Sequence, residues 1–127
     1  MRCIINIFIL LLALTFSFDV FAKVNCPPTE TITNLHFVRA DGAAGIWDLF
    51  SEKFHHADRI WEVTYTVYLP SAKNNEEALR LGEEFYKMNI DFFDSPLGRS
   101  DEDKQVCYYA QQEATYFVRA ISMSSKN

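Results

Sequence analysis

Apolar and polar side chains alternate most regularly between Arg59 and Pro70, in the sequence RIWEVTYTVYLP. A period of two in β-branched and aromatic residues is typical of a strand with one face on a core. The other face of this strand also contains apolar residues, Ile60 and Tyr68. We therefore expect a central strand that is partly covered on both sides. Pro70 ends the run, because proline cannot donate a hydrogen bond to a neighbouring strand.

Four shorter segments are also predicted to be strands. In the first of them, Leu35 and Phe37 alternate with His36 and Val38, and Asp41-Gly42 is expected to turn the chain. The last two flank a short polar segment and are expected to form a C-terminal hairpin. The ranges of the four predicted strands are Thr31–Ala40, Ile46–Phe54, Gln105–Ala110 and Ala114–Met123.

The segment Ile46–Phe54 fits two kinds of secondary structure. Ile46, Phe50 and Phe54 recur every four residues, as they would in a helix, and the same residues also lie on one face of a strand. We favour the strand. The polar segment His55-His56-Ala57-Asp58 that follows has the length of a hairpin turn, so a strand here would pair directly with the central strand.

One long helix is predicted after Pro70. Asn74 or Asn75 can cap its N-terminus, and Glu76 and Glu77 place negative charge in its first turn. Gly82 is unfavourable inside a helix, and close approach of the helix to the sheet would explain its presence. A stripe with spacings of three and four residues marks the packed face and contains Ala78, Leu81, Gly82, Phe85, Met88, Asn89 and Phe92.

These elements predict an α+β domain. Asp94–Gly98 is expected to end the helix, and Arg99–Lys104 is expected to be a charged, solvated loop. The resulting order is β-β-β-α-β-β, which we interpret as an antiparallel sheet of about five strands with one long helix packed on a face. We expect a single domain over residues 23–127, which is within the usual size of one domain.

The first 22 residues have the pattern of a secretory signal peptide. Arg2 supplies a positive start, Ile4–Leu14 is an apolar run broken only by Asn6, and Val20-Phe21-Ala22 suits cleavage after Ala22. A membrane anchor is the alternative, but the apolar run is shorter than the roughly 20 residues of a spanning helix. We therefore expect an exported protein, periplasmic or secreted, with no membrane segment after cleavage.

Cysteine content agrees with export. Cys3 lies in the predicted signal peptide, which leaves Cys26 and Cys107 as one pair in an oxidising compartment. A metal site or a catalytic thiol is the alternative, but two cysteines without a CxxC arrangement do not suggest zinc, and no flanking pattern suggests a nucleophile. We predict a disulfide bond between Cys26 and Cys107, and no metal site.

The charge of the chain argues against two classes of partner. The formal net charge is −5, and the predicted signal peptide contains one charge of each sign, Arg2 and Asp19, so the remainder has the same net charge. An acidic chain without a basic run is a poor match for nucleic acid or for an anionic membrane surface.

Histidine and tyrosine supply the candidate ligand-binding residues. His36, His55 and His56 have the side chains that ligate a metal or a haem iron, although an adjacent pair of histidines is more often part of an ordinary surface turn. Tyr108 and Tyr109 offer a phenolate ligand or an aromatic pocket, as do Tyr65, Tyr68 and Tyr116. The same rings are also what the core of a small domain requires, so both interpretations remain open. No serine lies in a GxSxG motif and no nucleophile–base pattern is present, so we do not predict an enzyme.

The overall layout resembles a family of small exported proteins from Legionella and related bacteria that includes a hemin-binding protein. The residues that carry the resemblance are Cys26-Pro27-Pro28, the segment Ile46–Ser51, Trp61, the helix rich in alanine and glutamate, and Val106-Cys107-Tyr108. The resemblance implies a periplasmic or secreted location and permits haem binding, but it brings no ligand motif to any residue.

Two functions follow as hypotheses. The first is an exported, non-enzymatic module that binds haem or another planar apolar ligand. The second is an envelope or secreted factor that binds a protein partner and has no small-molecule ligand. No cofactor is required by the sequence, and haem is the most concrete candidate.

Overall fold

The computed structural model describes residues 24–123 and is organised around the strand β4, Arg59–Tyr68. All strands belong to one antiparallel sheet with the order β1-β2-β4-β7-β6-β5, and β3 also pairs with β4. The remaining elements are α2 (Thr29–Thr33), β1 (Phe37–Ala43), β2 (Ile46–Ser51), β3 (Phe54–His56), α3 (Asn75–Asn89), β5 (Leu97–Asp101), β6 (Lys104–Gln112) and β7 (Tyr116–Met123). The fold is α+β, as expected.

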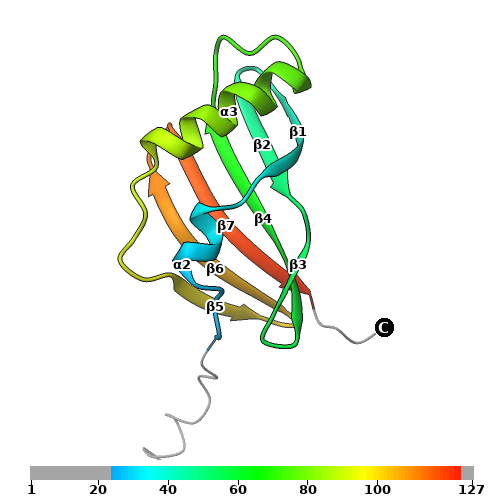
Figure 1. Ribbon diagram of the computed structural model, residues 1–127, viewed down its shortest axis with the longest axis vertical. Helices are drawn as coiled ribbons and strands as arrows, with labels where there is room; N and C mark the ends of the chain where they lie inside the picture. Colours follow the sequence, from blue (N-terminus) through cyan, green and yellow to red (C-terminus); the bar gives the residue numbers. More distant parts are fainter. Residues whose placement is uncertain (1–23, 124–127) are drawn as a thin grey trace, which may run out of the picture.

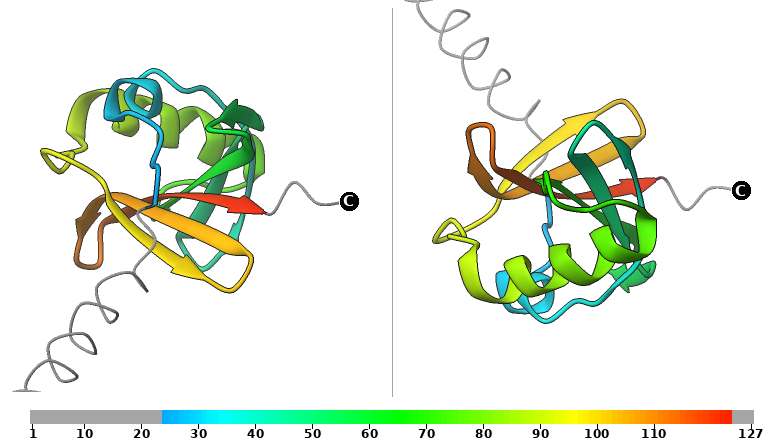
Figure 2. Two further views of the ribbon diagram at one scale, coloured as in Figure 1. Left: turned by 90° about the horizontal axis from the view of Figure 1, so that it is seen from below. Right: turned by 90° about the horizontal axis from the view of Figure 1, so that it is seen from above.

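Both helices lie on the same side of the sheet. Figure 1 looks onto this side, with α3 and α2 in front of the strands, and the two views of Figure 2 show the sheet edge-on with both helices to one side. We call the side that carries the helices the core face and the opposite side the outer face. No helix or strand of residues 24–123 covers the outer face.

The central strand behaves as its alternation predicts. Trp61, Val63, Tyr65 and Val67 point to the core face and are fully buried or nearly so. On the outer face, Thr64 is also buried, whereas Ile60 and Tyr68 are exposed at the two ends of the strand. The strand is therefore central, with β2 on one side and β7 on the other, and its outer face is covered only in the middle.

The long helix packs closely on the sheet through Gly82. A Cβ atom at this position would lie 2.6 Å from Cδ2 of Leu49, a fully buried residue of β2. This contact confirms that close approach to the sheet explains a glycine inside the helix. The predicted cap is confirmed too, since Oδ1 of Asn74 accepts a hydrogen bond of 2.8 Å from the backbone N–H of Glu77.

The predicted strand over Ile46–Phe54 is confirmed in two pieces. β2 and β3 both pair with β4, and the chain leaves the sheet between them at Glu52 and Lys53. The buried hydroxyl of Ser51 accepts a hydrogen bond of 2.9 Å from the backbone N–H of Val63, which replaces a ladder bond at this break.

The predicted strand over Thr31–Ala40 is wrong in its first half, where the chain forms the short helix α2. Pro28 precedes this helix, and its carbonyl accepts hydrogen bonds from the N–H groups of Thr31 and Ile32. Ile32 is fully buried, and its carbonyl accepts a hydrogen bond of 2.6 Å from the hydroxyl of Tyr86 on α3. A contact with a distant residue thus stabilises a helical turn that is too short to have a periodicity of its own.

Two turns are shifted from their expected positions. Asp41 and Gly42 lie inside β1, and the β1–β2 turn is at Ala44 and Gly45, which both have positive φ. Gly42 is required for a different reason, because a Cβ there would clash with the carbonyl oxygen of Ile46 on the neighbouring strand. The hairpin before β4 turns at Ala57 and Asp58 only.

The predicted loop over Arg99–Lys104 and the predicted strand count are also wrong. Leu97–Asp101 is an edge strand, β5, paired with β6. All its residues are exposed, so it has no period of two. With β3 and β5, the sheet formed by residues 24–123 has seven strands rather than about five. Helix α3 ends at Asn89, although the predicted apolar stripe includes Phe92. Phe92 fits the stripe because it also packs on Tyr86, from the loop that follows the helix.

Candidate functional site

An apolar groove lies beside the β6–β7 hairpin. It has a volume of about 550 Å³ and is lined by residues of β2, β4 and β7 and by the hairpin residues 111–115. Ile46, Tyr68 and Phe117 provide its large apolar groups. This volume is within the range of ligand-binding pockets, which are mainly apolar with few polar groups.

Strand register brings these groove residues together on the outer face. Ile46 of β2 lies opposite Tyr68 of β4, and Thr66 of β4 lies opposite Phe117 of β7. The hairpin end is joined to β4 by a hydrogen bond of 2.9 Å from the N–H of Tyr68 to the carbonyl of Thr115. Ile46 and Tyr68 are 56% and 50% exposed, so large apolar surfaces remain open to solvent in this groove.

Tyr116 fixes the base of the hairpin from the core side. Its ring packs near Phe85 of α3, and its hydroxyl accepts a hydrogen bond of 3.1 Å from the N–H of Asp91. A second hollow of about 660 Å³ lies on the other side of the hairpin, near Phe93, and its lining is mainly polar. Of these two hollows in the described part of the chain, the first has the character of a site for an apolar ligand.

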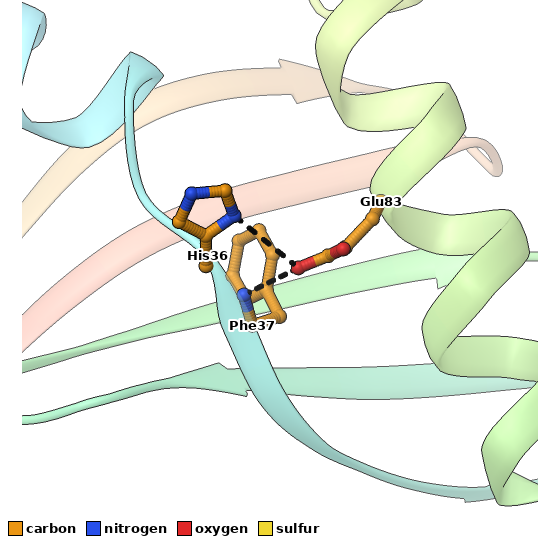
Figure 3. A network of polar contacts seen from close by, with 3 residues as sticks. All are labelled: His36, Phe37 and Glu83. Carbon is orange, nitrogen blue, oxygen red and sulfur yellow. Dashed lines mark hydrogen bonds and ion pairs between the residues drawn. The ribbon is translucent and has the colours of Figure 1, made fainter.

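His36 lies outside the groove, as the residue directly before β1. Its Nδ1 is 4.0 Å from Oε1 of Glu83 on α3, and its side chain is largely exposed (Figure 3). The same carboxylate oxygen accepts a hydrogen bond of 2.8 Å from the backbone N–H of Phe37. Glu83 thus fixes the beginning of β1 to the helix, and His36 adds an exposed ion pair to this contact when it is protonated.

His55 and His56 point to opposite sides of β3. His55 pairs with Ile60 and is exposed, whereas His56 is partly buried against Trp61, whose indole N–H donates a hydrogen bond of 3.0 Å to the His56 carbonyl. Neither histidine lines the groove. Within residues 24–123, no three histidine, cysteine, aspartate or glutamate side chains form a group that could hold a metal ion.

The adjacent tyrosines have different surroundings. Tyr109 is buried on the core face, at an irregularity between Tyr108 and Ala110, and its hydroxyl donates a hydrogen bond of 2.5 Å to the carbonyl of Pro27. Burial also raises the pKa of Tyr109, which disfavours a phenolate. Tyr108 lies on the outer face, with its ring centroid 5.6 Å from that of Phe117, a residue of the groove.

Ligand binding by the five predicted residues therefore stays a prediction, and the structure brings only Tyr108 next to the groove. The alternation of the strands did not identify Ile46 and Phe117 as groove residues. A signal was nevertheless present, since both are large apolar residues at positions where a strand with one covered face would have polar ones. Ile60 and Tyr68 show the same exception on the central strand.

The disulfide bond between Cys26 and Cys107 is confirmed, with Cα atoms 5.8 Å apart. The bond joins the segment before α2 to β6. Gly98 of β5 leaves space for the bond, because a Cβ atom at this position would lie 3.1 Å from Sγ of Cys26. A disulfide is compatible with an exported protein. The predicted signal peptide, residues 1–22, lies outside the described residues.

In the described part of the chain, neither helix has the length and apolar character needed to span a membrane. Comparison of the chain with family models, with curated proteins and with solved structures gives no match. The resemblance to the exported Legionella family thus stays a prediction.

Proposed function

We propose that this is an exported, non-enzymatic protein that binds a small, planar, largely apolar ligand in the groove of the outer face. The observation that carries the proposal is the groove itself. It combines a volume of about 550 Å³ with exposed aromatic and aliphatic side chains, on a sheet face that no other element of residues 24–123 covers.

Haem is the ligand to test first. A planar ring would contact Ile46, Tyr68 and Phe117, and burying their exposed surfaces would favour binding. Of the residues that line the groove, Tyr68 has a phenol on the outer face that is half exposed, so it is the side chain placed to reach an iron.

The test is a titration of the purified protein with hemin, followed in the Soret band. We expect a saturable change at one-to-one stoichiometry. In Ile46→Asp a charge would be buried by the ligand, so binding should weaken by about tenfold or more. Ile60→Asp is the matched control, because Ile60 is also exposed on the outer face but does not line the groove. A change that does not saturate, or equal weakening in both variants, would contradict the groove as the haem site.

A protein partner is the second candidate function, and the apolar side chains outside the groove favour it. Ile60, Leu97 and Met123 are large, exposed and on the outer face or its edge. Ile60 and Met123 lie directly opposite each other on β4 and β7, and contiguous exposed apolar side chains often mark interaction surfaces. A partner that covers this face would be lost in Ile60→Asp and Leu97→Asp in a pull-down from periplasm or host lysate. Capture that is unchanged in both variants would count against this function.

A further inference from the structure

Three neighbouring strands carry a ladder of arginine and aromatic side chains beside the groove. We call this set the arginine–aromatic ladder: Arg99 of β5, Tyr108 of β6, and Phe117 and Arg119 of β7. The guanidinium carbon of Arg99 is 6.0 Å from the ring centre of Tyr108, whose ring is 5.6 Å from that of Phe117. The guanidinium carbon of Arg119 is 5.6 Å from the ring centre of Phe117. Phe117 therefore belongs both to this ladder and to the groove wall.

Arg119 lacks the partners that a partly buried arginine normally has. Its Nε is buried and makes no hydrogen bond within residues 24–123. Two ion pairs are present within residues 24–123, His36–Glu83 and Arg80–Glu84. No carboxylate of these residues therefore pairs with Arg119. Its contact with the ring of Phe117 is favourable for the charge but does not satisfy the N–H donors.

The neighbours of Arg119 on the outer face do not replace such a partner. Thr64 lies directly opposite on β4, and Tyr108 lies directly opposite on β6. Glu62 is the next outer-face residue of β4 after Thr64. It lies opposite Ile121 rather than Arg119, and it forms no ion pair with Arg119. Asp48 of β2 accepts a hydrogen bond of 2.6 Å from the hydroxyl of Thr66 on β4 and does not pair with Arg119. Within residues 24–123 the guanidinium beside Phe117 thus has neither a carboxylate partner nor a side-chain hydrogen bond.

We infer that the ligand of the groove carries a carboxylate that pairs with Arg119 while its apolar body lies against Phe117, Tyr68 and Ile46. A planar guanidinium presents two parallel N–H donors that match the two oxygens of a carboxylate. This inference rests on the proposed function, since it concerns the ligand of the same groove. The net charge of −5 repels anions from the chain as a whole, so recognition depends on this local cation.

The experiment compares two fluorescent probes with the same planar apolar body, pyrenebutyrate and pyrenebutanol. We expect the purified protein to bind pyrenebutyrate about tenfold or more tightly than pyrenebutanol, because a charge-assisted hydrogen bond forms only with the acid. In Arg119→Met this preference should fall to about twofold or less, with little change in pyrenebutanol binding, since methionine keeps an apolar side chain at the position. Arg119→Lys should keep part of the preference, because lysine keeps the charge but not the paired donors.

Arg80→Met is the matched control, because Arg80 is an exposed arginine on α3 whose partner is Glu84. Far-UV circular dichroism checks that each variant is folded. Should Arg119→Met not fold, Arg119→Gln tests the same position, and the preference should again fall to about twofold or less because glutamine removes the charge. Equal affinity for the acid and the alcohol, or the same loss in Arg80→Met, would overturn the inference and leave the proposed groove intact. If neither probe binds saturably, the proposed function fails, and the inference fails with it.

Discussion

The two faces of the sheet use similar aromatic side chains in different ways. On the core face, Tyr86 and Tyr109 donate their hydroxyl protons to the carbonyls of Ile32 and Pro27, so both rings are buried and tied to the segment that contains α2. On the outer face, Tyr68 and Phe117 line an open groove, and the adjacent Arg119 has a buried donor without a partner. The difference teaches that aromatic content alone could not distinguish core from site, whereas burial and hydrogen bonding do.

The same contrast appears in how the chain is tied together. The segment before β1 is attached to the core face by the Cys26–Cys107 disulfide and by the hydrogen bonds of Tyr86 and Tyr109. No segment of residues 24–123 covers the outer face in a similar way. We interpret the core face as the source of stability and the outer face as the proposed binding surface.

The largest expected effect comes from removing the disulfide. The double variant Cys26→Ser, Cys107→Ser should be less stable by about 4 kcal/mol, because the bond closes a long loop in the unfolded chain. The sequence separation of the two cysteines is 81. Urea unfolding of the oxidised protein and the variant measures the difference. A loss well below about 1 kcal/mol would show that the bond does not hold the core face together.

The second comparison separates the faces within a single strand. Leu49→Ala should cost about 2–5 kcal/mol, because Leu49 is fully buried beneath Gly82 and its loss leaves a cavity. Ile46→Ala, on the outer face of the same strand, should change stability by no more than about 0.5 kcal/mol. Urea unfolding of both variants is the measurement. A similar cost at both positions would contradict the division into a stabilising face and a binding face.

A finer comparison uses two buried tyrosines. Tyr109→Phe should cost about 1–3 kcal/mol, because it leaves the carbonyl of Pro27 without its hydrogen bond. Tyr65→Phe should be neutral or stabilising, since the Tyr65 hydroxyl is buried without a partner in the described residues. Thermal or urea unfolding distinguishes the two, and a larger cost for Tyr65→Phe would contradict the hydrogen-bond assignment.

The same tyrosines predict a loss of stability in alkali. Burial raises the pKa of Tyr65, Tyr86 and Tyr109 above the value of about 10 that tyrosine has in an unfolded chain. The neutral phenol is therefore favoured by folding. Its contribution is complete below about pH 10 and is lost as the pH rises above that value. Urea midpoints measured across this range should fall, and they should fall less in Tyr65→Phe.

The sequence predicted those parts of the fold that repeat a local pattern. The alternation in Arg59–Tyr68 and the stripe from Ala78 to Phe85 each reflect one buried face, so β4 and α3 could be recognised. Helix α2 and the edge strand β5 could not. The first depends on the distant hydroxyl of Tyr86, and the second is exposed on every residue and is held by backbone pairing with β6.

The candidate site was less predictable than the fold for a related reason. The groove depends on the pairing of Ile46 with Tyr68 and of Thr66 with Phe117, and strand order is not encoded in any one segment. The histidines were singled out for their chemistry, but they lie on separate elements away from the groove. Apolar residues on the expected polar face of three strands were the signal that pointed to the outer face.

The central claim, that the groove of the outer face is the ligand site, is tested most directly by mapping a bound ligand with NMR. The protein, labelled at backbone amides and at isoleucine, leucine and valine methyl groups, is titrated with pyrenebutyrate. We predict ring-current shifts at the methyl groups of Ile46 and at the amides of residues 111–117, with Leu49 and Val63 on the core face little changed. Shifts concentrated on the core face or around His36, His55 and His56, with Ile46 unchanged, would contradict the account.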